Sequence, residues 1–123
     1  MKCEWLVTSD YGLVDQKGKP GMIGIFDTIA VENLPVLHPR LAVSFKVTGA
    51  QANPGLSISL LGPKGNTLYQ HSAPDFQVGP DGVAYGVFLL DNLRFAEEGA
   101  HVFSVRDGET ELSRTIVKIS AKA

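Results

Sequence analysis

The sequence predicts an all-β sandwich of about seven to nine mostly antiparallel strands, formed by a single domain over residues 1–123. Apolar and polar residues alternate with a period of two in nearly every segment, as they do in half-buried strands. Turn clusters built on 13 Gly and 7 Pro separate these segments, and no window carries a helical apolar stripe. A chain of this length, 44% hydrophobic and 20% charged, can bury one core without staples.

The first two expected strands are CEWLVTSDY and GMIGIFDTIAV, residues 21–31. Period two places four aliphatic side chains on one face of the second strand: Ile23, Ile25, Ile29 and Val31. Asp27 interrupts this row. Either the strand is continuous and Arg40 or Lys46 pairs with the carboxylate, or a bulge at Phe26–Asp27 turns Asp27 outward. Both alternatives make Asp27 a structural polar residue rather than a catalytic one.

The middle and last strands follow from the same alternation. LAVSFKV and LSISL each place apolar residues inward and small or polar residues outward, and GPKGN turns the chain into TLYQH. VAYGVFLL and HVFSVRDGETELSRTIVKIS supply the remaining strands, with Asp107-Gly108 as the hairpin turn. The result is a meander of short strands, as in a sandwich.

The run AEEGAHVFSV resembles the corner and F strand of immunoglobulin-like domains. His101 stands where those domains usually carry Tyr, and Phe103 stands at the next inward position, often Cys. The resemblance implies an immunoglobulin-like β-sandwich without an inter-sheet disulfide. It also implies that His101 is a core residue hydrogen-bonded to a backbone carbonyl.

The N-terminal third carries a second resemblance, in MKCEWLVTSDYG, then Gly18-Lys19, MIGIFDTI and LPVLHPRLAVSF. Together these segments resemble a family of small bacterial proteins catalogued only as a domain of unknown function. The resemblance implies a stand-alone, cytoplasmic, bacterial β-sandwich. It implies no activity, cofactor or catalytic residue.

Charge and cysteine content argue against several partners and compartments. The net charge is −2, and Lys and Arg are scattered singly, so we expect no nucleic-acid partner. No segment has the length of a signal peptide or membrane span, so we expect a cytoplasmic protein without membrane contact. Cys3, the single cysteine, is expected to be a small buried hydrophobe rather than a reactive thiol.

No constellation in the sequence predicts catalysis, a cofactor or a metal. His38, His71 and His101 lie in three segments without metal-ligand spacing, and most aspartates adjoin turns. The chain has no GxSxG elbow, Cys–His pair or phosphate-binding loop. We therefore expect no enzyme, and a metal-dependent or hydrolytic activity ranks third among the hypotheses.

The most informative feature is an excess of apolar residues in VAYGVFLL. If Val83, Tyr85, Val87 and Leu89 face inward, Phe88 and Leu90 face outward. With Met22 and Phe26 they would form an exposed patch, unless loops or a helical turn of the same chain cover it. We therefore predict a non-catalytic interaction module. It would present a sheet face or edge strand to a protein partner or to a second copy, as a symmetric homodimer.

The second hypothesis is binding of a small molecule or glycan at the loop ends. LPVLHPR reads as an extended loop stiffened by two prolines, and HSAPDF as another loop with an aromatic residue. The candidate ligand residues are His38, Arg40, Tyr69 and Phe76.

Overall fold

The computed structural model describes residues 1–51, 55–72 and 78–121, and within them all the regular secondary structure is β-strand. In chain order the strands are β1 (Lys2–Val14), β2 (Pro20–Ile25), β3 (Thr28–Val31), β4 (Val36–Thr48), β5 (Leu56–Leu61), β6 (Thr67–Ser72), β7 (Ala84–Phe95), β8 (Gly99–Asp107) and β9 (Thr110–Ala121). These ranges contain no helix capable of crossing a membrane.

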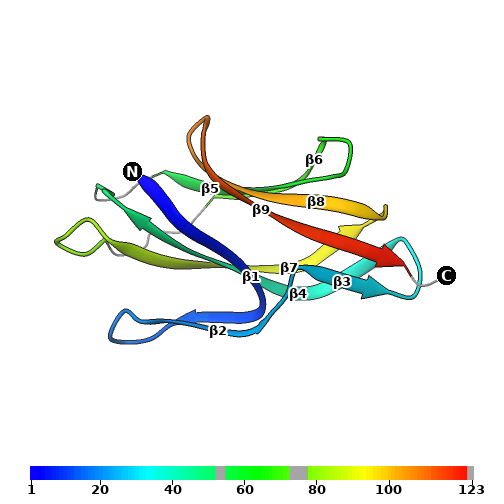
Figure 1. The fold of residues 1–123 in the computed structure, drawn as a ribbon, viewed down its shortest axis with the longest axis horizontal. Coiled ribbons are helices and arrows are strands. Elements are labelled where there is room, and N and C mark those ends of the chain that lie inside the picture. The colour runs from blue at the N-terminus through cyan, green and yellow to red at the C-terminus, as the bar shows by residue number, and fades with distance from the viewer. Residues whose placement is uncertain (52–54, 73–77, 122–123) are drawn as a thin grey trace.

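The strands form two sheets, which Figure 1 shows as two layers. One sheet has four strands in the order β2-β1-β4-β7, and the other has five in the order β3-β9-β8-β5-β6. Neighbouring strands are antiparallel, except that β3 runs parallel to β9.

This strand order is that of an immunoglobulin-like sandwich. Strands β4 and β7 occupy the positions of the B and E strands, and β5, β8 and β9 occupy those of C, F and G. The short β3 follows the first sheet in sequence but joins the edge of the second, beside β9. The predicted fold class is therefore confirmed, with β2 as an addition to the first sheet.

The core lies between the two sheets and consists of alternate side chains from both. Its largest fully buried members include three phenylalanines: Phe45, Phe95 and Phe103. Phe103 occupies the position at which many immunoglobulin-like domains carry a disulfide cysteine, and its ring fills the space between the sheets. Cys3 is also buried, its thiol donates to the carbonyl oxygen of Trp5 at 3.2 Å, and burial raises the pKa of the thiol.

His101 lies in the core near the start of β8, as the immunoglobulin-like resemblance implies. Its Nδ1 is 3.1 Å from the carbonyl oxygen of Gly99, within the distance of a hydrogen bond. The imidazole meets the ring of Phe95 edge to face, with 5.2 Å between centroids. Its Nε2 is buried without a hydrogen-bond partner in the part of the chain that the structure describes.

Asp27 lies at a bend between β2 and β3, with its side chain exposed. Asp27 turns outward, as the bulge alternative predicts, but the segment divides at Phe26–Asp27 into two strands that belong to different sheets. The hydroxyl of Thr28 donates to the Asp27 carboxylate at 3.2 Å, and the Asp27 carbonyl accepts from the amide of Lys118 at 2.8 Å. Arg40, considered above as a partner for Asp27, instead pairs with Asp91 at 2.8 Å.

The predicted outward-facing patch is wrong for β7. Phe88 and Leu90 are almost completely buried, whereas Leu89 is 46% exposed, so the two faces of this strand are the reverse of the prediction. Met22 and Phe26 are half-buried, and Phe26 packs against the core. The four side chains therefore do not form the exposed surface that the sequence suggested.

Candidate functional site

Strand β1 bends sharply in its middle, and its second half forms one wall of a surface groove (Figure 1). Its first part, up to Ser9, pairs with β4, whereas Tyr11–Val14 pairs only with β2. At the bend the hydroxyl of Ser9 donates to the carbonyl of Tyr11 at 3.0 Å. Gly24 on β2 lies beside Asp10. Its φ of 70° suits glycine, and the absence of a side chain leaves room for that of Asp10. We call residues 10–25 the arm.

The arm lies on the outer face of the four-stranded sheet, where Gly12 fits closely against Ala42, Ser44 and the Val87 side chain of β7. A Cβ on Gly12 would come within 2.7 Å of the Ser44 Oγ and 3.3 Å of the Ala42 Cβ. Ser9, Ala42 and Ser44 are all fully buried, although they belong to the sheet face opposite the core. The Ser44 hydroxyl has no hydrogen-bond partner among the described residues. The arm is thus a partial third layer.

Between the arm and β7 runs a groove with a volume of about 900 Å³. One wall is the arm itself, from Tyr11 to Gln16, and the other is β7 from Ala84 to Leu89. The turn at Val78–Asp81 lies at one end. The groove therefore follows two strands over several residues instead of forming a compact hole.

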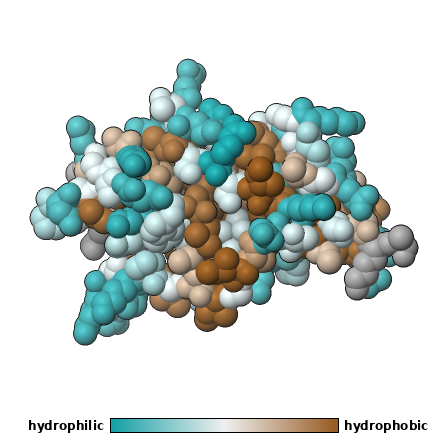
Figure 2. Space-filling view, viewed as in Figure 1, coloured by the Kyte–Doolittle hydropathy of each residue, from teal (hydrophilic) through white to brown (hydrophobic). Residues whose placement is uncertain are grey.

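Apolar side chains are exposed around this groove. Leu13 and Tyr11 of the arm are exposed on one wall, and Leu89 projects from the other. On the neighbouring strand of the arm, Ile23 and Ile25 are each 65% exposed. Figure 2 shows hydrophobic surface gathered where β1 bends into the arm. Exposed apolar clusters of this kind are typical of surfaces that bind other molecules.

Aromatic residues continue the outer face of the sheet beyond the arm. Trp5, Lys46 and Tyr85 lie side by side on β1, β4 and β7. The Trp5 and Tyr85 ring centroids are 6.0 Å apart, and the Lys46 Nζ lies 5.7 Å from the Tyr85 centroid. The ammonium group therefore makes a cation–π contact with the Tyr85 ring, which also contacts Trp5.

Two carboxylates are the charged groups among the described residues that line the groove: Asp15 and Asp81. Asp15 Oδ1 accepts hydrogen bonds from the amides of Lys17 and Lys19 at 2.9 and 2.8 Å. Asp81 Oδ1 accepts from the amide of Val83 at 3.2 Å. Each carboxylate therefore stabilises a turn while leaving its negative charge beside the groove.

Of the predicted loop-end ligand residues, the three that the structure describes lie on two different sheets. His38 and Arg40 lie within β4, not in a loop, and Tyr69 lies on β6 of the other sheet. The His38 ring lies between the rings of Phe26 and Phe95, with 6.5 Å between centroids in each case. Phe76 lies outside the described residues.

Near the edge of the other sheet, Tyr69 stacks on His71 of its own strand, with 6.3 Å between centroids. No group of three or more His, Cys, Asp or Glu side chains is positioned to hold a metal ion in the ranges that the structure covers.

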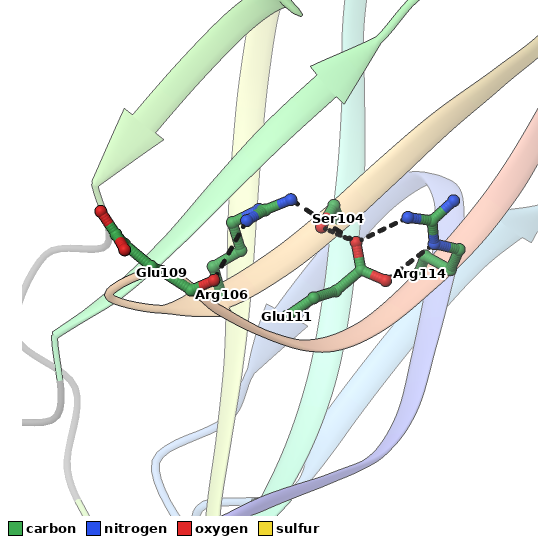
Figure 3. Close-up of polar contacts among 5 residues, drawn as sticks. All are labelled: Ser104, Arg106, Glu109, Glu111 and Arg114. Atoms are coloured by element: carbon green, nitrogen blue, oxygen red, sulfur yellow. Dashed lines mark hydrogen bonds and ion pairs between the residues drawn. The ribbon is translucent and has the colours of Figure 1, made fainter. Parts of the chain in front are cut away.

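A second polar cluster lies on the outer face of the five-stranded sheet (Figure 3). Glu111 accepts hydrogen bonds from Arg114 at 2.7 and 2.9 Å and from the buried hydroxyl of Ser104 at 2.6 Å. Arg106 adds an ion pair at 3.8 Å. These donors, Arg114 first and Ser104 next, hold the pKa of Glu111 below its usual range. These contacts hold β8 and β9 together, and we call Ser104, Arg106, Glu111 and Arg114 the Glu111 clamp.

A family model matches this chain from residue 4 to residue 120, which includes the arm and both walls of the groove. The chain belongs to the Family of unknown function (DUF6941). Among solved structures, this DUF6941 chain is similar to an immunoglobulin-like protein from Pseudomonas aeruginosa. That similarity has 13% identity and a TM-score of 0.47, and covers 91% of this chain and 90% of the other. No curated protein matches the DUF6941 chain significantly.

Sequence reasoning missed the groove of this DUF6941 protein, although one signal for it was present. Gly12 interrupts a strand pattern, and glycine inside a strand often marks close approach of another backbone. The small residues that meet it, Ala42 and Ser44, read as the polar side of an ordinary strand. Their contact with Gly12 depends on the bend after Ser9, which the alternation does not reveal.

Proposed function

We propose that this protein is a non-catalytic interaction module that binds a partner protein in the groove between the arm and β7. The observation that carries the proposal is the combination of an elongated groove of about 900 Å³ with exposed apolar side chains on both walls. Solvent-exposed apolar surface is unfavourable in isolation, and burying it against a partner removes that cost. A cytoplasmic location is part of the proposal, because a chain with one buried cysteine requires no oxidising compartment.

The shape of the surface favours a different protein over a second copy of this chain. In a two-fold symmetric dimer the same patch meets itself. A groove centred on the two-fold axis would then face another groove, and the space between them would remain unfilled. A convex or extended partner fills it directly.

A small molecule or glycan is the second candidate ligand. We place its binding site in the groove instead of at the loop ends. The groove volume lies within the range of ligand sites, and Tyr11 and Tyr85 offer aromatic surfaces close to Asp15 and Asp81. Aromatic stacking combined with carboxylate acceptors suits a hydroxyl-rich ligand.

The test is to capture binding partners from source-cell extract on three tagged proteins in parallel: the wild type, Leu89→Asp and Ile116→Asp. Leu89→Asp places a charge on the groove wall. Ile116→Asp is the matched control, because Ile116 is 56% exposed but lies on β9, in the other sheet. We expect a stoichiometric partner with the wild type and with Ile116→Asp, and its loss with Leu89→Asp. Circular dichroism and thermal unfolding would verify that both variants fold.

The same samples distinguish the alternatives. Equal recovery of the partner with Leu89→Asp would contradict docking in the groove. A bound small molecule detected by mass spectrometry, in place of a protein, would favour the second candidate. Concentration-dependent dimerisation in analytical ultracentrifugation, abolished by Leu89→Asp, would favour self-association.

A further inference from the structure

We propose that the partner enters the groove as an extended, basic segment that pairs with the main chain of β1 along Tyr11–Val14. This inference rests on the proposed function and specifies the chemistry of the partner. Three features of the groove support it: an unpaired strand edge, a β7 wall of regularly spaced apolar side chains, and two carboxylates among the lining residues.

The unpaired edge belongs to the second half of β1. The pairing of β1 with β4 ends at Ser9, and Tyr11–Val14 pairs with β2 on one side only. No strand in the described part of the chain pairs with the other side. The consecutive residues from Tyr11 to Gln16 line the groove, whereas β2 does not, so the unpaired edge faces the groove. Such an edge is a template for an added strand.

The β7 wall of the groove carries side chains at the spacing of an extended chain. Tyr85, Val87 and Leu89 project from the same face of β7 at every second residue. An extended segment beside Tyr11–Val14 presents every second side chain toward this β7 wall. Apolar residues at alternate positions of the partner would therefore contact β7, while its main chain pairs with β1.

The two lining carboxylates favour a basic residue in the segment, although Lys17 and Lys19 are also exposed in the turn that holds Asp15. Asp15 and Asp81 are the charged residues among the described lining residues, and both belong to turns. Figure 1 shows the turn after β1 and the turn before β7 at the same side of the molecule. A Lys or Arg at the matching end of the partner segment would meet two carboxylates.

The test is selection from a displayed library of random ten-residue peptides against the immobilised full-length protein. D15N/D81N is the key variant, because Asn Oδ1 still accepts the turn hydrogen bonds while the charge is lost. Leu89→Asp is the groove variant, and Ile116→Asp is the control on the other sheet. We expect the wild type and the control to enrich peptides with alternating apolar residues and a Lys or Arg at one end. Their affinity should fall about threefold to tenfold in D15N/D81N.

Main-chain pairing has its own readout. With a selected peptide bound, the amide groups of Tyr11–Val14 should exchange more slowly with solvent, and N-methylation of alternate peptide bonds should abolish binding. Three results would overturn the inference and leave groove docking in place. The enriched peptides could lack a basic residue, they could bind D15N/D81N as well as the wild type, or they could leave the amides of Tyr11–Val14 unprotected. Enrichment that is absent, or that persists in Leu89→Asp, would overturn the inference and the proposed function together.

Discussion

The ring of Phe45 on β4 covers the backbone of Gly86, its partner on the edge strand β7. A Cβ on residue 86 would overlap the ring, with Cε1 at 2.7 Å. The same ring contacts Phe88 at 5.3 Å between centroids. Coverage of a strand glycine by a cross-strand aromatic ring fixes the register of the two strands and fills the space that glycine leaves.

Gly86→Ala should destabilise the fold by about 2 kcal/mol, because the added methyl group displaces a ring that is held in a packed core. Phe45→Leu alone should also destabilise, since it leaves space above Gly86. The double variant should be more stable than the sum of the two effects predicts, because the smaller side chain makes room for the methyl group. Urea unfolding of the four proteins measures this coupling, and strict additivity would contradict the contact.

Gly12→Ala should detach or strain the arm, because its Cβ would lie 2.7 Å from the Ser44 Oγ. We expect a loss of about 1 to 3 kcal/mol in the free energy of unfolding. Ser44→Ala should be neutral or slightly stabilising, since it removes a buried hydroxyl without a described partner. Combining the two should restore part of the loss. Chemical denaturation gives the energies, and an equal loss with and without Ser44→Ala would disprove the contact.

The Glu111 clamp should make stability depend on pH in a defined window. Because Arg114 and Ser104 lower the pKa of Glu111 in the folded state, its contribution is complete above the pKa of the unfolded chain. As pH falls below about 5, the unfolded state takes up the proton first, and stability declines until the folded-state pKa is passed.

Glu111→Gln should therefore be less stable than the wild type at neutral pH, and the difference should shrink as the solution is acidified. Glu109→Gln is the matched control in the same hairpin, because Arg106 is bonded to the carbonyl of Glu109 rather than to its carboxylate. Unfolding measured from pH 7 to pH 3 provides the comparison. A difference that stays constant over this range would contradict the clamp.

His101→Phe should change the free energy of unfolding by no more than about 1 kcal/mol. It removes the bond to the Gly99 carbonyl but also removes the buried Nε2, and it keeps the edge-to-face contact with Phe95. His101→Ala should cost about 3 kcal/mol, because it leaves a cavity in the core. Similar losses for the two variants in thermal unfolding would show that the hydrogen bond, not the ring, is the main contribution.

Alternation predicts the sandwich well where only one side of a strand is apolar. In Leu41–Val47 the inward residues are Leu41, Val43, Phe45 and Val47, as the pattern indicates. In β7 both sides are apolar, so period two cannot select the inner face. The pairing of Phe45 with Gly86 decides it, and that pairing is a property of the register rather than of either strand alone.

The sequence pattern predicted neither the strand at LPVLHPR nor the bend that forms the arm, because both depend on contacts with other strands. Two prolines suggested a loop, but β4 begins at Val36, and the register between β4 and β7 has no pair at Pro39. The strand thus accommodates a residue that cannot donate its amide. The bend after Ser9 depends on contacts with β2 and β4, so the groove could not be located from the N-terminal segment alone.

The parallel pairing of β3 with β9 has a consequence for synthesis on the ribosome. Ile29 on β3 lies beside Ile119 on β9. The main-chain hydrogen bonds of β3 therefore cannot form until β9 has been synthesised. Until then, β3 and the apolar side of β8 have no partner in β9 and present open edges to other nascent chains. Long-range pairing of this kind slows folding and increases the risk of aggregation. The five-stranded sheet therefore closes only once β9 has been synthesised and can pair with both β3 and β8.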